Sequence, residues 1–354
     1  MASKIEREQE SKKKAQRKGA IILGFGLVFI FLSFYTYQIL LADNVLLDKA
    51  DKELFIPTGA PFKQVVDSLE QGEFIHDRLS FMFLSKFFGY RENVKPGRYV
   101  LKRNMNNLQL IKKLKGGHQD PLKLTIVNFR TKEELARRFS KRLQIDSTTF
   151  IKVLNDNQLL TQYGFNDTTV IALFIPNSYE IYWTADAKEI LEVFYRGYKQ
   201  FWNQQRTAKA QNIGLTPVQT IIMASIIDME TQRNDEKPRI AGVYMNRLNA
   251  GQRLQADPTL IFATRDFAAR RVNEYHRYFK SPFNTYRRKG LPPGPINTPS
   301  VTSIDAVLNY EKHDYYFFCA NPNLSGYHLF SHNFGEHLGV AQNYWKSLDK
   351  ENIH

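Results

Sequence analysis

The apolar stretch Gly19–Ala42 constrains the architecture of this chain most, because it contains no charge and is long enough to span a bilayer as a helix. Basic residues precede it, and flanking positive charge stays on the cytoplasmic side. We therefore expect a cytoplasmic basic tail over 1–18, a transmembrane helix over 19–42 and the remaining chain outside. The alternative is a cleaved signal peptide, which the length of the stretch and the lack of a clear cleavage site disfavour.

Length and charge narrow the function classes. The 354 residues allow the tail and about two domains, and the net charge of +14 indicates an anionic partner: nucleic acid, a lipid surface or an acidic envelope polymer. No helix-turn-helix, zinc-finger or RNP motif is present, so no nucleic acid is expected. The single cysteine, Cys319, excludes an intramolecular disulfide, and we expect a small buried side chain there.

A small module follows the membrane segment. Periodicity and turn residues predict two helices, a strand, a third helix and a further strand: Phe62–Gln71, Leu79–Phe88, Val94–Leu101, Leu108–Leu114 and Leu122–Phe129. The module starts at Ile56–Gly59, and with a first strand its order is β-α-α-β-α-β, which is compatible with a self-standing module. The module carries no acidic pair or metal-type cluster, so a binding or structural role is expected.

The chain after Thr131 is predicted to be mainly helical with short strands. The helices are Thr131–Leu143, Ser147–Leu154, Ala187–Gln205, Arg239–Leu248 and Ser303–Asn309, and the strands are Leu173–Pro176, Tyr315–Ala320 and His328–Phe330. The expected fold class is therefore α+β: one N-terminal transmembrane helix, a small αβ module over 53–120 and a mainly helical domain over 121–354.

The segment Leu215–Thr231 carries the clearest functional signal. Thr216 suits an N-cap and Pro217 the first helical position, and an apolar helix follows that should be buried on most sides. Asp228 and Glu230 lie at its C-terminal end, where the helix dipole disfavours anions. An acid in such an apolar setting should have a raised pKa, which suits a proton donor.

The two acids do not form a pair, because residues two apart on a helix point about 200° away from each other. At most one of Asp228 and Glu230 therefore faces a given cleft. The alternative interpretation is that both acids mark the point where the helix emerges into solvent.

Three polar, turn-rich segments follow, over 254–259, 281–299 and 326–337. They contain the Asn, Gln, Thr and Tyr donors and acceptors that a neutral sugar needs, and the Pro-Pro-Gly-Pro sequence at 292–295 suits a rigid cleft wall. The alternative is that they are ordinary loops. His328, His332 and His337 raise a zinc hypothesis, but their context is typical of strand and turn, so no metal is expected. The sequence contains no Gly-x-Ser-x-Gly nucleophile elbow, so a serine hydrolase is not expected.

Several motifs together carry a family resemblance. In chain order they are Lys95–Tyr99, Phe174–Tyr179, Met223–Thr231, Ala241–Leu248, Leu254–Thr259, Asn284–Tyr286 with Gly290–Pro295, and Gly326 to His337. With the N-terminal anchor, they resemble the YceG-like endolytic murein transglycosylases (the MltG family) over nearly the whole exported chain. The chain departs from the family pattern at Asp228, where Glu is usual, and at Val170–Ala172, which replace Leu-Glu-Gly.

The resemblance implies an enzyme without cofactor. It identifies Glu230 as the catalytic acid of lytic cleavage at the MurNAc-β-1,4-GlcNAc bond, which forms a 1,6-anhydroMurNAc end. It implies that the module over 53–120 is LysM-like and grips glycan. Candidate substrate-binding residues, chosen for their polar side chains within the motifs, are Gln255, Asp257, Asn284, Tyr286, Asn246 and Tyr179.

The resemblance also implies a location and partners. The expected location is the cytoplasmic (inner) membrane, with a single-pass anchor and the catalytic domain in the periplasm or outside. The partners are nascent peptidoglycan glycan strands, whose elongation the cut would terminate, and peptidoglycan synthases. Two rival functions remain open: a non-catalytic peptidoglycan-binding scaffold, and a zinc-dependent hydrolase that uses the three histidines.

Overall fold

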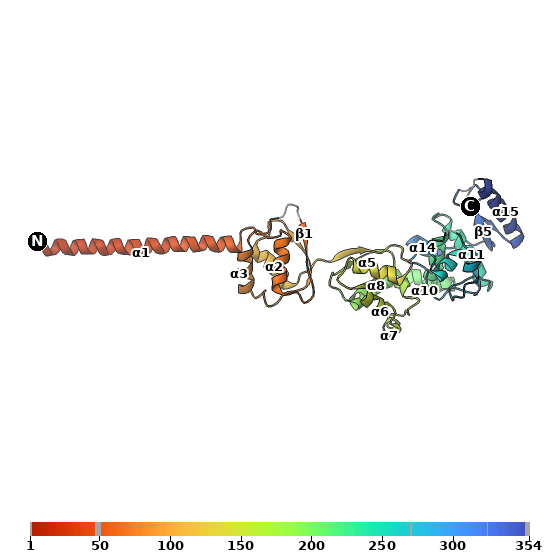
Figure 1. Cartoon of the computed structure of the whole chain (residues 1–354), viewed down its shortest axis with the longest axis horizontal. Coiled ribbons are helices and arrows are strands. Elements are labelled where there is room, and N and C mark those ends of the chain that lie inside the picture. The colour runs from red at the N-terminus through yellow and green to blue at the C-terminus, as the bar shows by residue number, and fades with distance from the viewer. Residues whose placement is uncertain (1, 47–50, 270, 324, 351–354) are drawn as a thin grey trace. The chain divides into compact units, whose positions relative to one another are not determined.

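The computed structural model describes residues 2–46, 51–269, 271–323 and 325–350. The chain divides into two compact units: unit 1 is Met1–Pro121 with Tyr182–Thr184, and unit 2 is Leu122–Ile181 with Ala185–His354. Two predicted ranges extend past the described residues. Met1, in the predicted tail, and residues 351–354, in the predicted helical domain, lie outside them. Figure 1 shows the helices and strands of both units.

Unit 1 begins with the long helix α1, Ala2–Leu40. Its part Lys12–Leu40 has a mean hydropathy of 2.1 and is long and apolar enough to cross a membrane. The apolar side chains along this part are exposed, so they do not form the core of a soluble domain. Helix α1 is therefore consistent with a single-pass membrane anchor.

The rest of unit 1 is a small α/β module. It contains β1 (Asp51–Ile56), α2 (Phe62–Gln71), α3 (Arg78–Phe87), β2 (Gly97–Lys102) and α4 (Asn107–Gly116). The strands pair antiparallel, with Leu54 opposite Tyr99. One apolar core joins the strands to the three short helices and includes Phe81, Tyr90 and Tyr99. The predicted helices and the strand near 94–101 are confirmed.

The last strand predicted for the module lies in unit 2 instead. Strand β3 (Leu122–Thr125) belongs to unit 2, where it pairs antiparallel with β4 (Ser178–Ile181). It is also shorter than the predicted range Leu122–Phe129. Alternating apolar residues reveal that a strand exists and which face is buried, but they do not reveal its pairing partner.

Unit 2 is mostly helical with short strands, as predicted (Figure 1). Its helices are α5 (Lys132–Ser140), α6 (Ser147–Leu154), α7 (Asn157–Thr161), the 3₁₀ helix η1 (Val170–Leu173), α8 (Ala187–Phe201), α9 (Gln204–Asn212), α10 (Pro217–Glu230), α11 (Lys237–Asn249), α12 (Asp257–Thr264), α13 (Glu274–Tyr278), α14 (Val301–Leu308) and α15 (Phe334–Lys350). Strands β5 (Phe317–Ala320) and β6 (His328–Ser331) pair antiparallel.

Three local predictions were wrong. The expected strand Leu173–Pro176 is the end of η1 and a turn, because a short, fully buried apolar run looks alike as strand or helix. The expected helix Ala187–Gln205 is two helices, α8 and α9. The chain leaves helical geometry at Trp202, and Asn203 then caps α9 by accepting a hydrogen bond from the Arg206 amide. Cys319 is only half-buried.

Helix α10 is the centre of unit 2 and packs against α11, α12 and α14. It begins with the predicted cap: the Thr216 hydroxyl accepts from the Gln219 amide, and the Gln219 side chain accepts from the Thr216 amide. Its residues from Thr220 to Asp228 are buried without interruption. A helix held this firmly fixes the position of whatever side chain stands at its C-terminal end.

Candidate active site

Glu230 is the last residue of α10 and is partly buried. The Tyr244 hydroxyl, from α11, donates a hydrogen bond of 2.6 Å to Glu230 Oε1. Tyr244 is itself 1% exposed, so its position is fixed by packing. The carboxyl group is therefore held in one orientation by two core helices.

The surroundings of Glu230 raise its pKa to about 7 from an ordinary value of 4.5. Burial is the main cause, and the negative charge of Asp257 adds to it. The hydrogen bond from Tyr244 and the positive charge of Arg247 act in the opposite direction. The raised pKa expected from the apolar setting is confirmed. A carboxyl group with this pKa can both donate and accept a proton near neutral pH.

Arg247 supplies a fixed positive charge near Glu230. Its guanidinium donates to the backbone oxygen of Tyr316 at 2.6 Å and to that of Leu254 at 2.5 Å. It also lies over the Phe317 ring, 5.0 Å from the centroid. These contacts hold the guanidinium in place. None of them is a direct ion pair with Glu230.

Two pockets meet at Glu230, because both Glu230 and Asp257 line each of them. The larger pocket, of about 690 Å³, is also lined by Arg130, Met229, Pro258, Ile261, Phe262, Phe267, Ala269, Arg271, Val272, Ile296 and Tyr344. The smaller pocket, of about 360 Å³, is also lined by Tyr244, Arg247, Gln255, Arg277, Tyr286, Phe317, Phe318, Phe334 and His337. A polymer bound at Glu230 can therefore extend into both pockets.

Three of the predicted binding residues lie in these pockets. Asp257, the first residue of α12, lines both, and its Oδ1 accepts a 2.6 Å hydrogen bond from the Tyr286 hydroxyl. Gln255 lines the smaller pocket with a left-handed φ of 53°. A non-glycine residue in that conformation costs about 1–3 kcal/mol and often occurs at functional sites.

The other three predicted binding residues line neither pocket. Asn284 is fully buried, where its side chain donates to the backbone oxygens of Arg277 and Phe279 and accepts from the Tyr286 amide. These bonds position the loop that carries Tyr286. A buried amide with such backbone partners is a structural brace, and its complete burial keeps a sugar from reaching it in this conformation.

Asn246 and Tyr179 also have structural partners. The Asn246 side chain donates to the backbone oxygens of His313 and Tyr315, at 2.8 and 3.0 Å. Tyr179 lies on β4 in the core, where its hydroxyl donates to the Ile175 oxygen at 2.8 Å. Polarity within a motif suggested sugar contacts for both, but the structure uses them to tie segments of unit 2 together.

Sequence reasoning selected Asn246 and missed its neighbours Tyr244 and Arg247. These two are three residues apart on α11 and both reach the smaller pocket. The i, i+3 spacing puts them on one helix face, and that signal was available in the sequence. The aromatic residues Phe317 and Phe334 of the same pocket carried no such signal.

Asp228 is buried in a polar network, so the interpretation that it marks an exit into solvent is wrong. Its Oδ1 accepts from the Ser300 and Ser303 hydroxyls, at 2.5 and 2.6 Å, and lies 3.5 Å from the Lys237 ammonium. Its Oδ2 accepts from the Asn128 side chain. The network joins α10 to α11 and α14 two residues before Glu230.

The three C-terminal histidines have separate partners. His328 contacts the buried Glu236 at 2.7 Å, and His332 contacts Asp314 at 3.0 Å. His337 stacks on Phe317 and lines the smaller pocket, where burial lowers its pKa. Within the described part of the chain, no group of three or more metal-ligating side chains is gathered.

The proline-rich loop lies elsewhere on unit 2. Gly290–Pro293 line a cavity of about 620 Å³ with Val218 and Ile222, near the N-terminal end of α10. At 1.5 Å per residue, Val218 is about 18 Å along the helix from Glu230. The loop is held closely, since a Cβ on Gly294 would lie 2.0 Å from the Thr168 oxygen. It therefore walls a different cavity from the one at Glu230.

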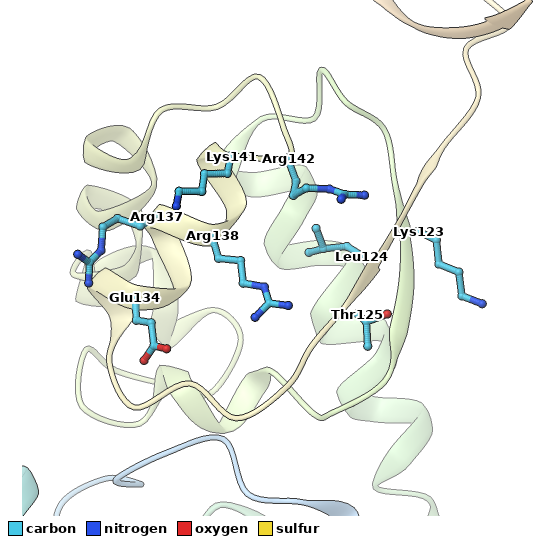
Figure 2. Close-up of a pocket in the computed structure, with 8 residues that line it drawn as sticks. All are labelled: Lys123, Leu124, Thr125, Glu134, Arg137, Arg138, Lys141 and Arg142. Atoms are coloured by element: carbon cyan, nitrogen blue, oxygen red, sulfur yellow. The ribbon is translucent and has the colours of Figure 1, made fainter. Parts of the chain in front are cut away.

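A further cavity of unit 2, about 700 Å³, gathers positive charge between α5 and β3 (Figure 2). It is lined by Lys123, Leu124, Thr125, Glu134, Arg137, Arg138, Lys141 and Arg142, which we call the basic pocket. Arg138 and Arg142 extend toward β3, whereas Lys123 points away on the other side of that strand (Figure 2). Glu134 accepts a hydrogen bond from the Arg130 amide at 3.0 Å, and Arg130 lines the larger pocket at Glu230.

Comparisons with known proteins agree with this architecture. The endolytic murein transglycosylase of Streptococcus pneumoniae is 24% identical over 340 residues, which cover 85% of this chain and 61% of the relative. The chain thus spans about three fifths of that relative's length. The endolytic murein transglycosylase of Bacillus subtilis is 25% identical over 319 residues, covering 86% of this chain and 87% of the relative.

A crystal structure of a yceG-like protein from Listeria monocytogenes has the same fold. It superposes with a TM-score of 0.54 at 27% identity, over 83% of this chain and 99% of that protein. The sequence profile of the YceG-like family matches residues 54–343, which is most of the chain. The chain belongs to the YceG-like family.

Proposed function

We propose that this protein is an endolytic peptidoglycan lytic transglycosylase. The observation that carries the proposal is Glu230, a fixed carboxyl group with a pKa of about 7 at the meeting point of two pockets. Membership of the YceG-like family and the names of the S. pneumoniae and B. subtilis relatives support it. The substrate is the glycan strand of peptidoglycan, cut at the MurNAc-β-1,4-GlcNAc bond.

The proposed mechanism needs one acid that changes role. Protonated Glu230 donates its proton to the bridging oxygen as the bond from that oxygen to the MurNAc C1 breaks, and GlcNAc leaves with a free 4-hydroxyl. The resulting Glu230 carboxylate then takes the proton of the MurNAc C6 hydroxyl. The C6 oxygen bonds to C1, which closes the 1,6-anhydro ring and returns the proton to Glu230. No water is consumed, and the substrate's N-acetyl group can stabilise the cation at C1.

The neighbouring side chains have distinct roles in this scheme. Tyr244 donates to Glu230 in its carboxylate form, and Arg247 offsets the negative charge that appears after the first proton transfer. Phe334, which is 58% exposed, offers an apolar face on which a sugar ring packs in the smaller pocket. Tyr286 holds Asp257 toward the same space.

A second candidate function is hydrolysis of the same bond, which Asp257 favours. Glycosidases use two carboxyl groups, one as acid and one as base or nucleophile, and Asp257 shares both pockets with Glu230. We prefer lytic cleavage because both relatives carry the transglycosylase name.

The remaining parts of the chain fit an anchored enzyme. We propose a cytoplasmic tail over 1–18, a span over 19–42, a LysM-like glycan-binding module over 53–120 and a catalytic domain over 121–354. The anchor lies in the cytoplasmic membrane and puts the catalytic domain on the outer side. Glu230 there meets strands that synthases are still extending, and an internal cut terminates their elongation.

Product analysis tests the proposal. The full-length protein in a non-ionic detergent is incubated with purified murein, and the released fragments are measured by mass spectrometry. Fragments with 1,6-anhydroMurNAc ends are expected, with undiminished yield in a metal chelator. Reducing ends would indicate the hydrolase instead, and no release at all would indicate the non-catalytic scaffold. Loss of release in the chelator would indicate the zinc enzyme.

The pH dependence should respond to two substitutions in opposite directions. Cleavage requires protonated Glu230, so the rate should fall as the pH rises above about 7. Tyr244→Phe removes a hydrogen bond that lowers this pKa, and the falling limb should move up by about one pH unit. Asp257→Asn removes a charge that raises it, and the limb should move down. If both substitutions moved the falling limb of the pH–rate profile in the same direction, the assignment of Glu230 as the acid would be wrong.

The basic pocket should recognise anionic parts of the substrate. Peptidoglycan stem peptides carry carboxylates, and the hydrogen bond between Arg130 and Glu134 links this pocket to the one at Glu230. Arg138→Gln with Arg142→Gln should raise KM several-fold on stem-bearing murein and leave kcat unchanged. Glycan without stems should show no effect. Lys188→Gln with Arg196→Gln, on the exposed side of α8, is the charge-matched control, and an equal rise there would contradict the assignment.

A further inference from the structure

Helix α3 of unit 1 has an unusual exposed face. Leu79, Phe83 and Phe87 stand four residues apart on one side of the helix and are 77%, 62% and 75% exposed. The opposite side of α3 carries Phe81 and Leu84, which are buried in the module core. We call the three exposed residues the α3 stripe. A contiguous apolar patch of this kind marks an interaction surface.

The α3 stripe adjoins the end of the membrane helix. Helix α1 contacts α3 and α4, and Ile39 and Leu40 pack against the module core. The Asn107 side chain, on α4, donates to the Ile39 backbone oxygen at 2.9 Å. Helix α3 lies on the side of the module from which α1 leaves (Figure 1). The module is therefore attached directly to the outer end of α1.

The depth of this attachment follows from the length of the span. A helix that enters the hydrocarbon core at Gly19 crosses its ~30 Å in about 20 residues, so it reaches the far interface near Ile39. Leu41 and Leu46, just beyond α1, are also about half exposed, at 48% and 50%. Exposed apolar side chains are thus present both at the outer end of the span and on α3, which contacts α1.

We propose that the α3 stripe inserts into the outer leaflet beside α1 and binds the lipid surface. Interfacial helices present apolar side chains to the acyl boundary and basic ones to the headgroups, and Lys86 lies about 20° from Leu79 around the helix, at the edge of the stripe away from Phe83. Its long side chain reaches lipid phosphates while its neighbours stay in the apolar layer. The lipid contact fixes the module against the membrane. The inference rests on α1 spanning the membrane, which is part of the proposed function.

Fluorescence quenching in lipid bilayers tests the contact. The full-length chain with Cys319→Ser receives one further cysteine by Phe83→Cys, Phe87→Cys, Gln64→Cys or Leu27→Cys, labelled with an environment-sensitive fluorophore. Gln64 is exposed on α2 and serves as the matched control, and Leu27 reports on the span. At positions 83 and 87, quenching by lipid-borne quenchers should exceed that at 64 several-fold, and quenching by aqueous iodide should be correspondingly weaker.

Three results would overturn the proposal, and they are distinguishable. If the label at 27 is quenched by lipid while those at 83 and 87 match 64, the anchor stands and the α3 contact is wrong. If the labels at 83 and 87 escape both quenchers, protein covers the stripe: a second copy or a partner. If the label at 27 escapes the lipid quencher, the membrane span itself fails, and with it the proposed location.

Discussion

Replacing Glu230 by Gln is expected to abolish the release of fragments from murein. The amide cannot donate a proton to the bridging oxygen, and loss of general acid catalysis costs about 10²–10⁴ in rate. Because the same group also deprotonates the C6 hydroxyl, both halves of the reaction are affected. The Tyr244 hydroxyl can still donate to the amide oxygen, so the pocket should keep its shape.

The loss must be separated from misfolding and from general loss of charge. Glu274→Gln removes a carboxylate from an exposed position of unit 2 and should retain the wild-type rate. Fragment release is measured for both variants in the same detergent. Wild-type release by Glu230→Gln would show that another group is the acid or that cleavage is not this protein's activity.

Glu230→Gln should also change how stability depends on pH. The folded pKa of about 7 lies above the ordinary 4.5, so the native state holds a proton that the unfolded state releases. Wild-type stability is therefore fully present below about pH 4.5 and falls as the pH rises to about 7, by no more than about 3 kcal/mol. The variant should lack this fall and unfold at higher denaturant concentration at pH 8. Parallel stability curves for the two proteins would contradict the raised pKa.

Replacing Asp228 by Ala should destabilise unit 2 by about 3–5 kcal/mol. The change leaves the Lys237 ammonium, whose side chain is 5% exposed, without its buried partner. It also removes the acceptor for the Ser300 and Ser303 hydroxyls. Since the network joins three helices next to Glu230, activity should fall along with stability.

Denaturant unfolding of the full-length chain measures this effect. The double variant Asp228→Ala with Lys237→Met removes both charges and should recover part of the lost stability. The reason is that two apolar side chains leave no unpaired charge in the buried site. If the free energy of unfolding of Asp228→Ala were within about 0.5 kcal/mol of the wild-type value, the network would not contribute to stability.

Local signals made much of the fold predictable. Helices α6 and α10 directly follow the capping residues Asp146 and Thr216, and their predicted positions match the observed ones. Pairing partners were not predictable, because β3 and β4 lie far apart in the chain and the alternation of apolar residues does not indicate which strands pair. The break between α8 and α9 was also missed, since no Gly or Pro marks it and Asn203, the cap of α9, directly follows Trp202.

The candidate site divides in the same way. One helix and its dipole pointed to both Asp228 and Glu230, and the family resemblance selected Glu230. The tertiary surroundings then explain its raised pKa. The role of Asp228 was left open, because its partners Ser300 and Ser303 are more than seventy residues away in the chain. Asn284 was selected for its polarity, yet polarity alone cannot distinguish a sugar contact from a buried amide that binds backbone.

Running the cleavage reaction in water enriched with heavy oxygen tests the central claim most directly. If Glu230 alone carries out lytic cleavage, the new ends are 1,6-anhydro rings closed by the sugar's own C6 oxygen. Mass spectrometry should then find no heavy oxygen in the fragments, each lighter by one water than a hydrolytic product. Reducing ends carrying heavy oxygen would contradict the account and assign the chemistry to a hydrolase that uses Glu230 and Asp257 together.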